Sequence, residues 1–226
     1  MKHIGIVDVT TVGACICANE IVAEANRRNF ADNHPEFTLH AFPFVRYKNS
    51  ILNQEWGKVA DLIVASIHKL KNAGADFAIL PVNTIHYAID EIIAHSPLPV
   101  LNLIEITVNE CVRRKFKKVG ILGTKLTMLN GLYTGKLLQQ NIVPVIPDNR
   151  VCDKIQHLIM NEILAANIQP QTVASLAEDI KRLDCEAVIL GCTELPEVYS
   201  EKILAIPAID TTRLLAHKAL EYANEP

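Results

Sequence analysis

The sequence predicts an α/β protein made of two similar packed lobes, each with a parallel β-sheet flanked by helices. Short apolar runs rich in β-branched residues alternate with longer amphipathic stretches. That alternation is typical of strands buried on both faces and joined by helices. Similar stretches also recur in the two halves of the chain. With 226 residues, of which 50% are hydrophobic, the chain can bury two compact lobes.

Eight apolar runs are the expected strands, and eight amphipathic stretches are the expected helices. The predicted strands are 3–7, 37–42, 77–80, 100–103, 119–122, 143–146, 187–190 and 204–206. The predicted helices are 14–29, 53–73, 84–94, 105–116, 127–140, 150–166, 172–183 and 211–223. Gly74 follows the second helix directly, as a glycine that ends a helix should.

Two landmarks indicate an internal repeat with pseudo-twofold symmetry. Residues 4–7 (IGIV) recur at 119–122 as VGIL, and residues 76–84 (DFAILPVNT) recur at 186–194 as EAVILGCTE. The two offsets, 115 and 110 residues, are nearly equal, which favours two copies of one unit over chance similarity of buried strands. We therefore expect a first lobe of residues 1–100 plus 208–226 and a second lobe of residues 101–207. The repeat makes Val82 the equivalent of Cys192.

Small polar residues stand where four of the predicted strands end. These stretches are 8–11, 83–84, 123–124 and 192–193. Ligands of parallel α/β sheets bind beyond the carboxyl ends of strands, and each following helix offers free backbone N–H groups. The pattern predicts a site for a small carboxylate. Each threonine taken singly fits an ordinary helix cap better than a ligand site; the four occurrences at equivalent strand ends favour the site.

Cys192 is the strongest single candidate for catalysis. It lies between a buried strand and a helix expected to begin near Glu194, where the pKa of a thiol should be lowered. Gly191 should let the backbone turn tightly there. Glu194 is either a base that lies behind the reacting cysteine and acts through it or a charge at the helix start. His86 either orients a base or packs within its helix.

The other cysteines are expected to be inert reduced thiols. The chain has six cysteines and no C-x-x-C pair, which favours a cytoplasmic protein and argues against a disulfide framework or a metal site. A net charge of -3 argues against a nucleic-acid or membrane partner. The basic run at 113–118 is typical of a solvated helix end.

Four segments resemble one known family. They are NTIH at 83–86, VGILGTKLTM at 119–128, VILGCTELP at 188–196 and IDTTRLLA at 209–216. They look like the corresponding segments of the aspartate/glutamate racemases, isomerases that need no cofactor. The resemblance extends over almost the whole chain.

The resemblance implies two facing lobes, often in homodimers, and a small carboxylate substrate such as aspartate or glutamate. One cysteine from each lobe moves the α-proton, and Cys192 matches the second-lobe acid/base. The remaining site residues are expected to bind the substrate. They are Asn83, Thr84, Thr124 and Thr193 for the α-carboxylate and amino group, Arg46 for a side-chain carboxylate, and Thr11, with Thr10, in the first loop.

At the first-lobe cysteine position this chain has Val82, which would line the substrate but can neither donate nor accept a proton. The family's glycine-rich first loop is also replaced, by residues 8–11 (DVTT). Racemisation could use another group (Asp8, Cys15 or water), or only one enantiomer could exchange its α-proton. Alternatively, the chemistry could need a single thiol, as in the arylmalonate decarboxylases. A binder of acidic amino acids without turnover is the alternative from a different class.

Overall fold

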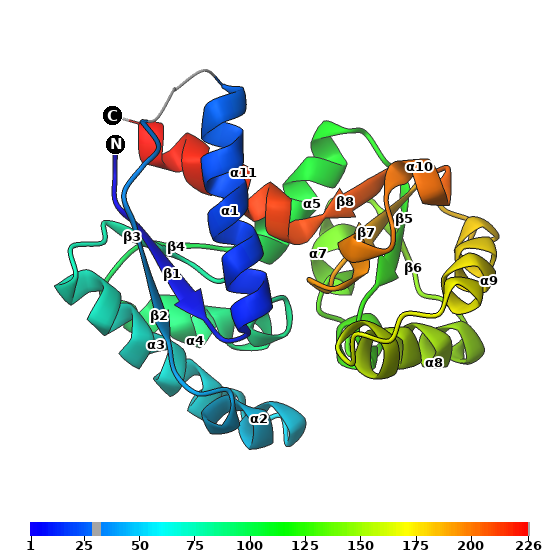
Figure 1. Ribbon diagram of the computed structural model, residues 1–226, viewed down its shortest axis with the longest axis horizontal. Coiled ribbons are helices and arrows are strands. Elements are labelled where there is room, and N and C mark those ends of the chain that lie inside the picture. Colours follow the sequence, from blue (N-terminus) through cyan, green and yellow to red (C-terminus); the bar gives the residue numbers. More distant parts are fainter. Residues whose placement is uncertain (29–32, 226) are drawn as a thin grey trace. The chain divides into compact units, whose positions relative to one another are not determined.

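The computed structural model describes residues 1–28 and 33–225 and confirms the predicted α/β class (Figure 1). The chain divides into two compact units. The first comprises Met1–Ile106 and Thr212–Pro226, and the second comprises Thr107–Thr211. The lobe boundaries predicted from the sequence, 1–100 plus 208–226 and 101–207, remain a proposal.

The first unit is a four-stranded parallel sheet with the strand order β2-β1-β3-β4. Helices lie between successive strands and after the last one. The elements are β1 (Ile4–Asp8), α1 (Thr11–Arg27), β2 (Phe37–Ala41), α2 (Val45–Leu52), α3 (Trp56–Asn72), β3 (Phe77–Ile79), the 3₁₀ helix η1 (Thr84–Ala88), α4 (Ile89–His95), β4 (Val100–Leu101), the first turn of α5 (Leu103–Arg113) and, from the end of the chain, α11 (Thr211–Asn224). The rest of α5, from Thr107, belongs to the second unit.

The second unit has the same architecture, with the parallel order β6-β5-β7-β8. Its elements are β5 (Lys118–Leu122), α6 (Lys125–Leu129), α7 (Thr134–Gln139), β6 (Val143–Val145), α8 (Asn149–His157), the π-helical turn η2 (Leu158–Ile163), α9 (Pro170–Lys181), β7 (Ala187–Leu190), the 3₁₀ helix η3 (Leu195–Glu197), α10 (Glu201–Leu204) and β8 (Ala208–Asp210).

The strand registers reproduce the repeat seen in the sequence. Ile4 pairs with Phe77 in the first sheet, and Val119 pairs with Ala187 in the second. Numbered in chain order within each unit, the strands of both sheets follow the order 2-1-3-4. Val82 and Cys192 therefore follow equivalent strands at equivalent distances along the chain.

Alternate residues of the first sheet enter two different apolar layers. Ile4 and Ile6 of β1 pack in a cluster with residues of α1 and α11, whereas Val7 packs with residues of α3 and α4. Successive side chains of a strand point to opposite faces, so a strand covered on both sides needs apolar residues throughout. This explains why β1 is a continuous apolar run up to its last residue, Asp8.

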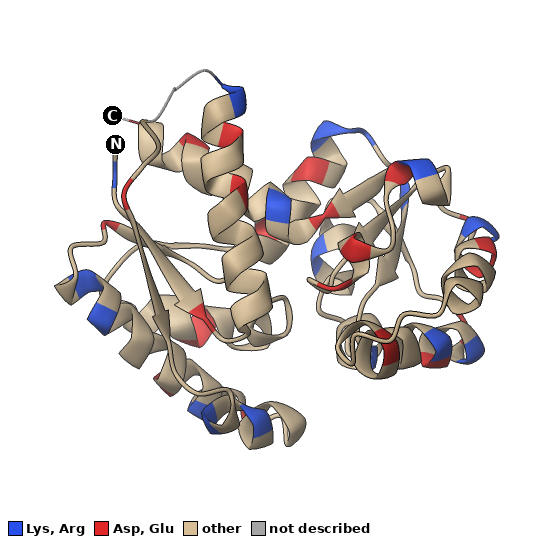
Figure 2. Cartoon of the chain, in the orientation of Figure 1, with Lys and Arg blue, Asp and Glu red and all other residues tan. Residues whose placement is uncertain are grey.

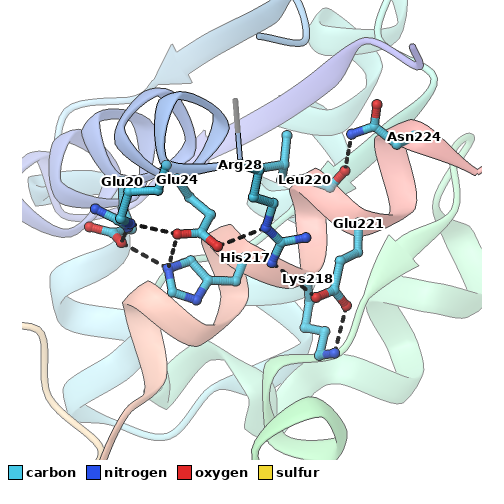
Figure 3. Close-up of polar contacts among 9 residues, drawn as sticks. Glu20, Glu24, Arg28, His217, Lys218, Leu220, Glu221 and Asn224 are labelled. Atoms are coloured by element: carbon cyan, nitrogen blue, oxygen red, sulfur yellow. Dashed lines mark hydrogen bonds and ion pairs between the residues drawn. The ribbon is translucent and has the colours of Figure 1, made fainter. Parts of the chain in front are cut away.

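An ion-pair network joins α1 to the C-terminal helix α11 (Figure 3). Glu20 contacts the His217 ring at 2.8 Å. Arg28 bridges the two helices, because its guanidinium lies 2.7 Å from Glu24 and 3.2 Å from Glu221. Together with the apolar contacts of α11, these pairs attach the end of the chain to the first unit.

Glu20, Glu24 and His217 are close enough to one another to share a metal ion. Their carboxylates are already paired with cations, since Arg27 contacts both glutamates and Arg28 contacts Glu24. A metal ion would have to displace those arginines. The contacts fit a structural clamp between helices.

The structure corrects several expected elements. The strand predicted at 204–206 is wrong: α10 ends at Leu204, Ala205 has a left-handed backbone with φ 54°, and β8 begins only at Ala208. The short helices α2 and α10 were not expected. The helix predicted at 127–140 is broken near Gly131, where φ is 79°. Asn29, the last residue of the first predicted helix, lies outside the described residues.

His86 has a structural role at the end of the first sheet. Its ring is buried, with Nδ1 2.9 Å from the Val82 carbonyl oxygen and Nε2 accepting the Leu103 N–H at 3.2 Å. These bonds need a neutral ring whose Nδ1–H donates to Val82. His86 thus ties the strand end that carries Val82 to the first residue of α5, which favours the packing interpretation of this histidine.

Acidification should destabilise the first unit through His86. Burial lowers the pKa of this ring from 6.5 to about 4. Between these values the unfolded chain binds a proton that the folded chain does not, so stability is present above pH 6.5 and is lost as the pH falls. The loss approaches about 3 kcal/mol near pH 4. Urea unfolding of His86→Gln between pH 4 and 7 should show a flatter pH dependence than the wild type.

The same variant should also be less stable at pH 7, by about 1–3 kcal/mol, because the Val82 carbonyl and the Leu103 N–H lose the imidazole that joins them. His68→Gln, an exposed position on α3, is the matched control. Equal pH dependence in His86→Gln and the wild type would contradict this account.

Candidate active site

Two glycines bring the carboxyl ends of β5 and β7 close together in the second unit. The Gly191 N–H donates to the Leu122 carbonyl at 2.7 Å. A Cβ on Gly123 would lie 3.1 Å from the Gly191 oxygen, and one on Gly191 would lie 3.1 Å from the Leu122 oxygen and from a Thr127 methyl group. Gly191 is not in the left-handed region, so the reason for glycine is this close approach and not the tight turn expected from the sequence.

Cys192 follows Gly191 at this edge and donates its thiol hydrogen to Glu194 Oε2 at 2.9 Å. Cys192 is partly exposed, whereas Glu194 is buried, at 6% exposure. The hydrogen bond joins a proton donor to a carboxylate across two residues of sequence. This cysteine–glutamate pair is the most chemically suggestive contact in the second unit.

The pKa of the Cys192 thiol is raised well above its ordinary value, first by burial and then by the Glu194 charge and hydrogen bond. This corrects the lowered pKa expected from the sequence. The expected helix is only the three-residue 3₁₀ turn η3, too short to offer much of a helix dipole. Near neutral pH the group at this position is therefore a thiol.

Three threonines lie at the same edge of the sheet as Cys192. Thr193 is buried, at 7% exposure. Thr124 caps α6, because its hydroxyl accepts the Thr127 N–H at 3.4 Å. The Thr211 hydroxyl donates to the Leu190 carbonyl at 3.1 Å, which fixes the strand end just before Cys192. Of the predicted site residues, the second unit thus brings Thr124, Cys192 and Thr193 to one sheet edge.

The equivalent edge of the first unit carries Val82, Asn83 and Thr84. Val82 packs against the apolar cluster of α3 and α4 and is partly exposed. Asn83 is buried, at 3% exposure, and immediately precedes η1, of which Thr84 is the first residue. This edge therefore has an apolar side chain where the second unit has a thiol, followed in both units by polar residues.

A carboxyl group nevertheless lies on the neighbouring strand. Asp8 ends β1 and is buried, at 2% exposure; burial raises its pKa, while a hydrogen bond from Thr11 and the nearby His40 lower it. The Tyr47 hydroxyl from α2 lies within the electrostatic influence of Asp8. Among the described side chains, Asp8 Oδ2 and the Tyr47 hydroxyl are the two buried polar atoms without a hydrogen-bond partner.

Sequence reasoning missed Tyr47 and His40. The His40 ring bonds to the Ser66 hydroxyl at 2.7 Å, and burial together with Lys69 and Arg46 lowers its pKa. The signal available in the sequence was a histidine within the second expected strand, close to its carboxyl end. Tyr47 lies on α2, which the sequence did not predict.

Arg46 is exposed on α2, with its guanidinium carbon 4.0 Å from the centroid of the Phe42 ring. A cation over an aromatic face is held by the ring's negative potential. Arg46 also contributes to the lowered pKa of His40 and influences Tyr47. The predicted carboxylate-binding cation thus stands in the same part of the first unit as Asp8.

Charged residues are interspersed over the helices of both units (Figure 2). Two residues of the basic run at 113–118 form ion pairs: Arg113 contacts Glu110, and Arg114 contacts Glu201. None of the six cysteines, all within the described residues, forms a disulfide. In the described part of the chain, no helix is both long and apolar enough to cross a membrane.

Comparisons with known proteins agree with these features. The sequence model of the family described as Asp/Glu/Hydantoin racemase matches residues 9–219. The chain is 29% identical, over 81% of its length and 80% of the relative, to a protein of Bacillus subtilis (strain 168) named broad specificity amino-acid racemase RacX.

Two solved structures share the whole fold. One, from Yersinia pestis, is described as a candidate Asp/Glu racemase; the TM-score is 0.92 at 25% identity, with 100% of both chains covered. Another is an aspartate racemase of Picrophilus torridus, with a TM-score of 0.78, 27% identity, and coverage of 100% of this chain and 96% of the other. On the extent of the family match and the shared two-lobe fold, the chain belongs to the Asp/Glu/hydantoin racemase family.

Proposed function

We propose that this protein is a cofactor-independent racemase of an amino acid with a carboxylate side chain, aspartate or glutamate, and that Cys192 is an acid/base of the reaction. The observation that carries the proposal is the 2.9 Å hydrogen bond from the Cys192 thiol to the buried Glu194 carboxylate at the carboxyl end of β7. Family membership supplies the reaction class, and the relative named as a broad-specificity racemase supports testing other amino acids too.

The proposed chemistry needs a group that can both lose and regain a proton. An α-proton of an amino acid is very weakly acidic, so the site must stabilise the carbanion with fixed dipoles and place proton-transfer groups within hydrogen-bond reach. Glu194 can accept the thiol proton of Cys192, leaving a thiolate that takes the α-proton. In the opposite direction the resting thiol donates its proton to the carbanion.

The remaining predicted residues supply the binding contacts in this proposal. Thr124 and Thr193 in the second unit, and Asn83 and Thr84 in the first, would bind the α-carboxylate and amino group. Arg46 would bind the side-chain carboxylate, because a guanidinium binds carboxylates bidentately. Thr11, next to Asp8, and Val82 would line the substrate. The expected homodimer and cytoplasmic location stay predictions.

One observation favours a second candidate, a decarboxylase that uses a single thiol. Val82 offers no proton, and the raised pKa keeps Cys192 protonated, as a proton donor to an enediolate must be. Such an enzyme would release carbon dioxide from a malonate-type substrate and leave aspartate and glutamate unchanged.

Proton NMR in deuterated water should show loss of the α-proton signal from L- and D-aspartate or glutamate in the presence of the protein. Cys192→Ser should lower this rate by about 10²-fold or more, because a hydroxyl is a far weaker acid than a thiol. Cys185→Ser, a partly buried cysteine outside the proposed site, is the matched control.

Full exchange activity in Cys192→Ser would contradict the role of this cysteine. A shift in melting temperature with aspartate but no exchange would identify a binder. Carbon dioxide release from an arylmalonate, with aspartate and glutamate untouched, would instead support the decarboxylase.

Glu194→Gln should make Cys192 react faster with iodoacetamide at pH 8. The Glu194 charge is one cause of the raised thiol pKa, and each unit by which that pKa falls increases the thiolate fraction about tenfold below the pKa. Peptide mass spectrometry can follow Cys192 separately from the exposed Cys15. Glu197→Gln, an exposed position in η3, is the control. Slower labelling of Cys192 in Glu194→Gln would show that Glu194 does not suppress the thiolate.

A further inference from the structure

We propose that Thr211 is a positioning residue for Cys192: its buried hydroxyl holds the strand end that orients the thiol. The inference rests on the proposed function, in which Cys192 transfers a proton and therefore has to be placed accurately. All the contacts involved lie within the second unit, which runs from Thr107 to Thr211. Thr211 itself does not react; it acts through the backbone that precedes the cysteine.

Thr211 lies where β8 ends and α11 begins, and it is completely buried. In a parallel ladder each residue bonds to the two neighbours of its partner. The Val188 N–H follows this pattern and donates to the Pro207 carbonyl at 2.9 Å. By the same pattern Leu190, two residues on, would bond to residues 209 and 211. The chain becomes helical at residue 211, and there the Thr211 hydroxyl donates to the Leu190 carbonyl at 3.1 Å.

This contact fixes the backbone directly before the reacting residue. Leu190 is bound to Thr211, and the next residue, Gly191, donates its N–H to the Leu122 carbonyl of β5 at 2.7 Å. Two successive residues are therefore held by two different segments of the second unit. Cys192 follows immediately, so its position depends on both contacts.

The hydrogen bonds of the thiol depend on that backbone position. The Cys192 sulfur accepts the backbone N–H groups of Thr193 and Glu194, and the thiol donates to Glu194 Oε2 at 2.9 Å. A shift of the strand end would move the thiol together with these contacts, away from the atom that it has to reach. An error of about 1 Å in the placement of a reacting group can slow a reaction by about 10²-fold.

The first unit provides an internal comparison, because its equivalent of Thr211 is Leu103. The strand residues paired with Ile79 and with Ile189 stand two positions before Leu103 and Thr211, respectively. A leucine side chain has no hydrogen-bond donor. The hydroxyl is therefore present in the unit that carries the cysteine and is replaced in the unit that carries Val82.

The carbonyl groups at these two strand ends accordingly have different donors. In the first unit the Leu80 carbonyl accepts the N–H of Val82, two residues further along the chain, at 2.8 Å. In the second unit the Leu190 carbonyl accepts from the Thr211 hydroxyl, 21 residues away in the sequence. A side chain distant in the sequence thus helps to place Cys192.

Thr211→Val tests the proposal, because valine matches threonine in shape but has no hydroxyl. We expect kcat for α-proton exchange of aspartate or glutamate to fall by about tenfold or more. KM should not change, because Thr211 acts on the placement of Cys192 and not on the substrate. Thr211→Ser keeps the hydroxyl and should keep most of the activity. Thr172→Val, at a partly buried position of α9, is the control.

Iodoacetamide labelling gives a second readout that needs no substrate. Loosening the strand end exposes Cys192 to water, and burial is the largest cause of its raised pKa. Its labelling in Thr211→Val at pH 8 should therefore become faster, by about threefold or more. The buried Cys152 of α8 reports on unfolding of the same unit, and its labelling should stay as slow as in the wild type.

Unchanged exchange and unchanged Cys192 labelling in Thr211→Val would overturn the proposal, and so would equal defects in Thr211→Val and Thr211→Ser. Should Thr211→Val fold poorly, Thr211→Ala removes the hydroxyl without crowding the site and takes its place. Equal acceleration of Cys152 and Cys192 in both variants would show a general loss of packing, which would also overturn the role assigned to Thr211. If the wild type exchanged no amino acid, the racemase function would be rejected, and the labelling of Cys192 would still decide whether Thr211 positions it.

Discussion

The parallel pairing of the first and third strands of each unit is the constraint on which the proposed site depends. Parallel strands end at the same edge of a sheet, so the residues that follow β1 and β3, or β5 and β7, lie together. In the second unit this edge is closed tightly by Gly123 and Gly191, with no room for a Cβ without movement of its neighbours. The cysteine after Gly191 is held by that backbone contact and by its bond to Glu194.

The two units have the same strand order but different side chains at the ends of their first and third strands. The second unit has a thiol after its third strand and a glycine after its first, whereas the first unit has a valine and a carboxyl group at these positions. Desolvation acts on both ionisable groups and raises the pKa values of Cys192 and Asp8. Burial thus favours the protonated thiol form of Cys192 and makes the Asp8 carboxylate a stronger base.

Much of the fold could be predicted because buried parallel strands leave a strong signal. The apolar runs containing Ile4, Phe77, Val119 and Ala187 all form strands, and the repeat correctly implied a common strand order. The last strand was misplaced because residues 204–206 are apolar too. The backbone of Ala205, in the middle of this segment, is left-handed, and a pattern of apolar residues does not reveal such a backbone conformation.

The sequence indicated which candidate residues follow the strands but not their electrostatics. Spacing placed Cys192, Asn83 and Thr193 at strand ends, yet the sign of the thiol's pKa shift depends on how much protein surrounds the group and on Glu194. The short helix α2 carries few apolar residues on one face, so its Tyr47 and the partnerless oxygen of Asp8 emerge only from packing. Roles for the individual residues stay predictions.

The central claim, that Cys192 transfers a proton at the α-carbon of an amino acid, is tested most directly by deuterium at that carbon. The wild-type protein and Cys192→Ser would each be incubated with a single enantiomer of aspartate or glutamate in deuterated water, and mass spectrometry would measure deuterium separately in the product and in the recovered substrate. The account predicts deuterium at the α-carbon with the wild type and about 10²-fold less of it, or none, with Cys192→Ser. Equal incorporation with the two proteins would contradict this account.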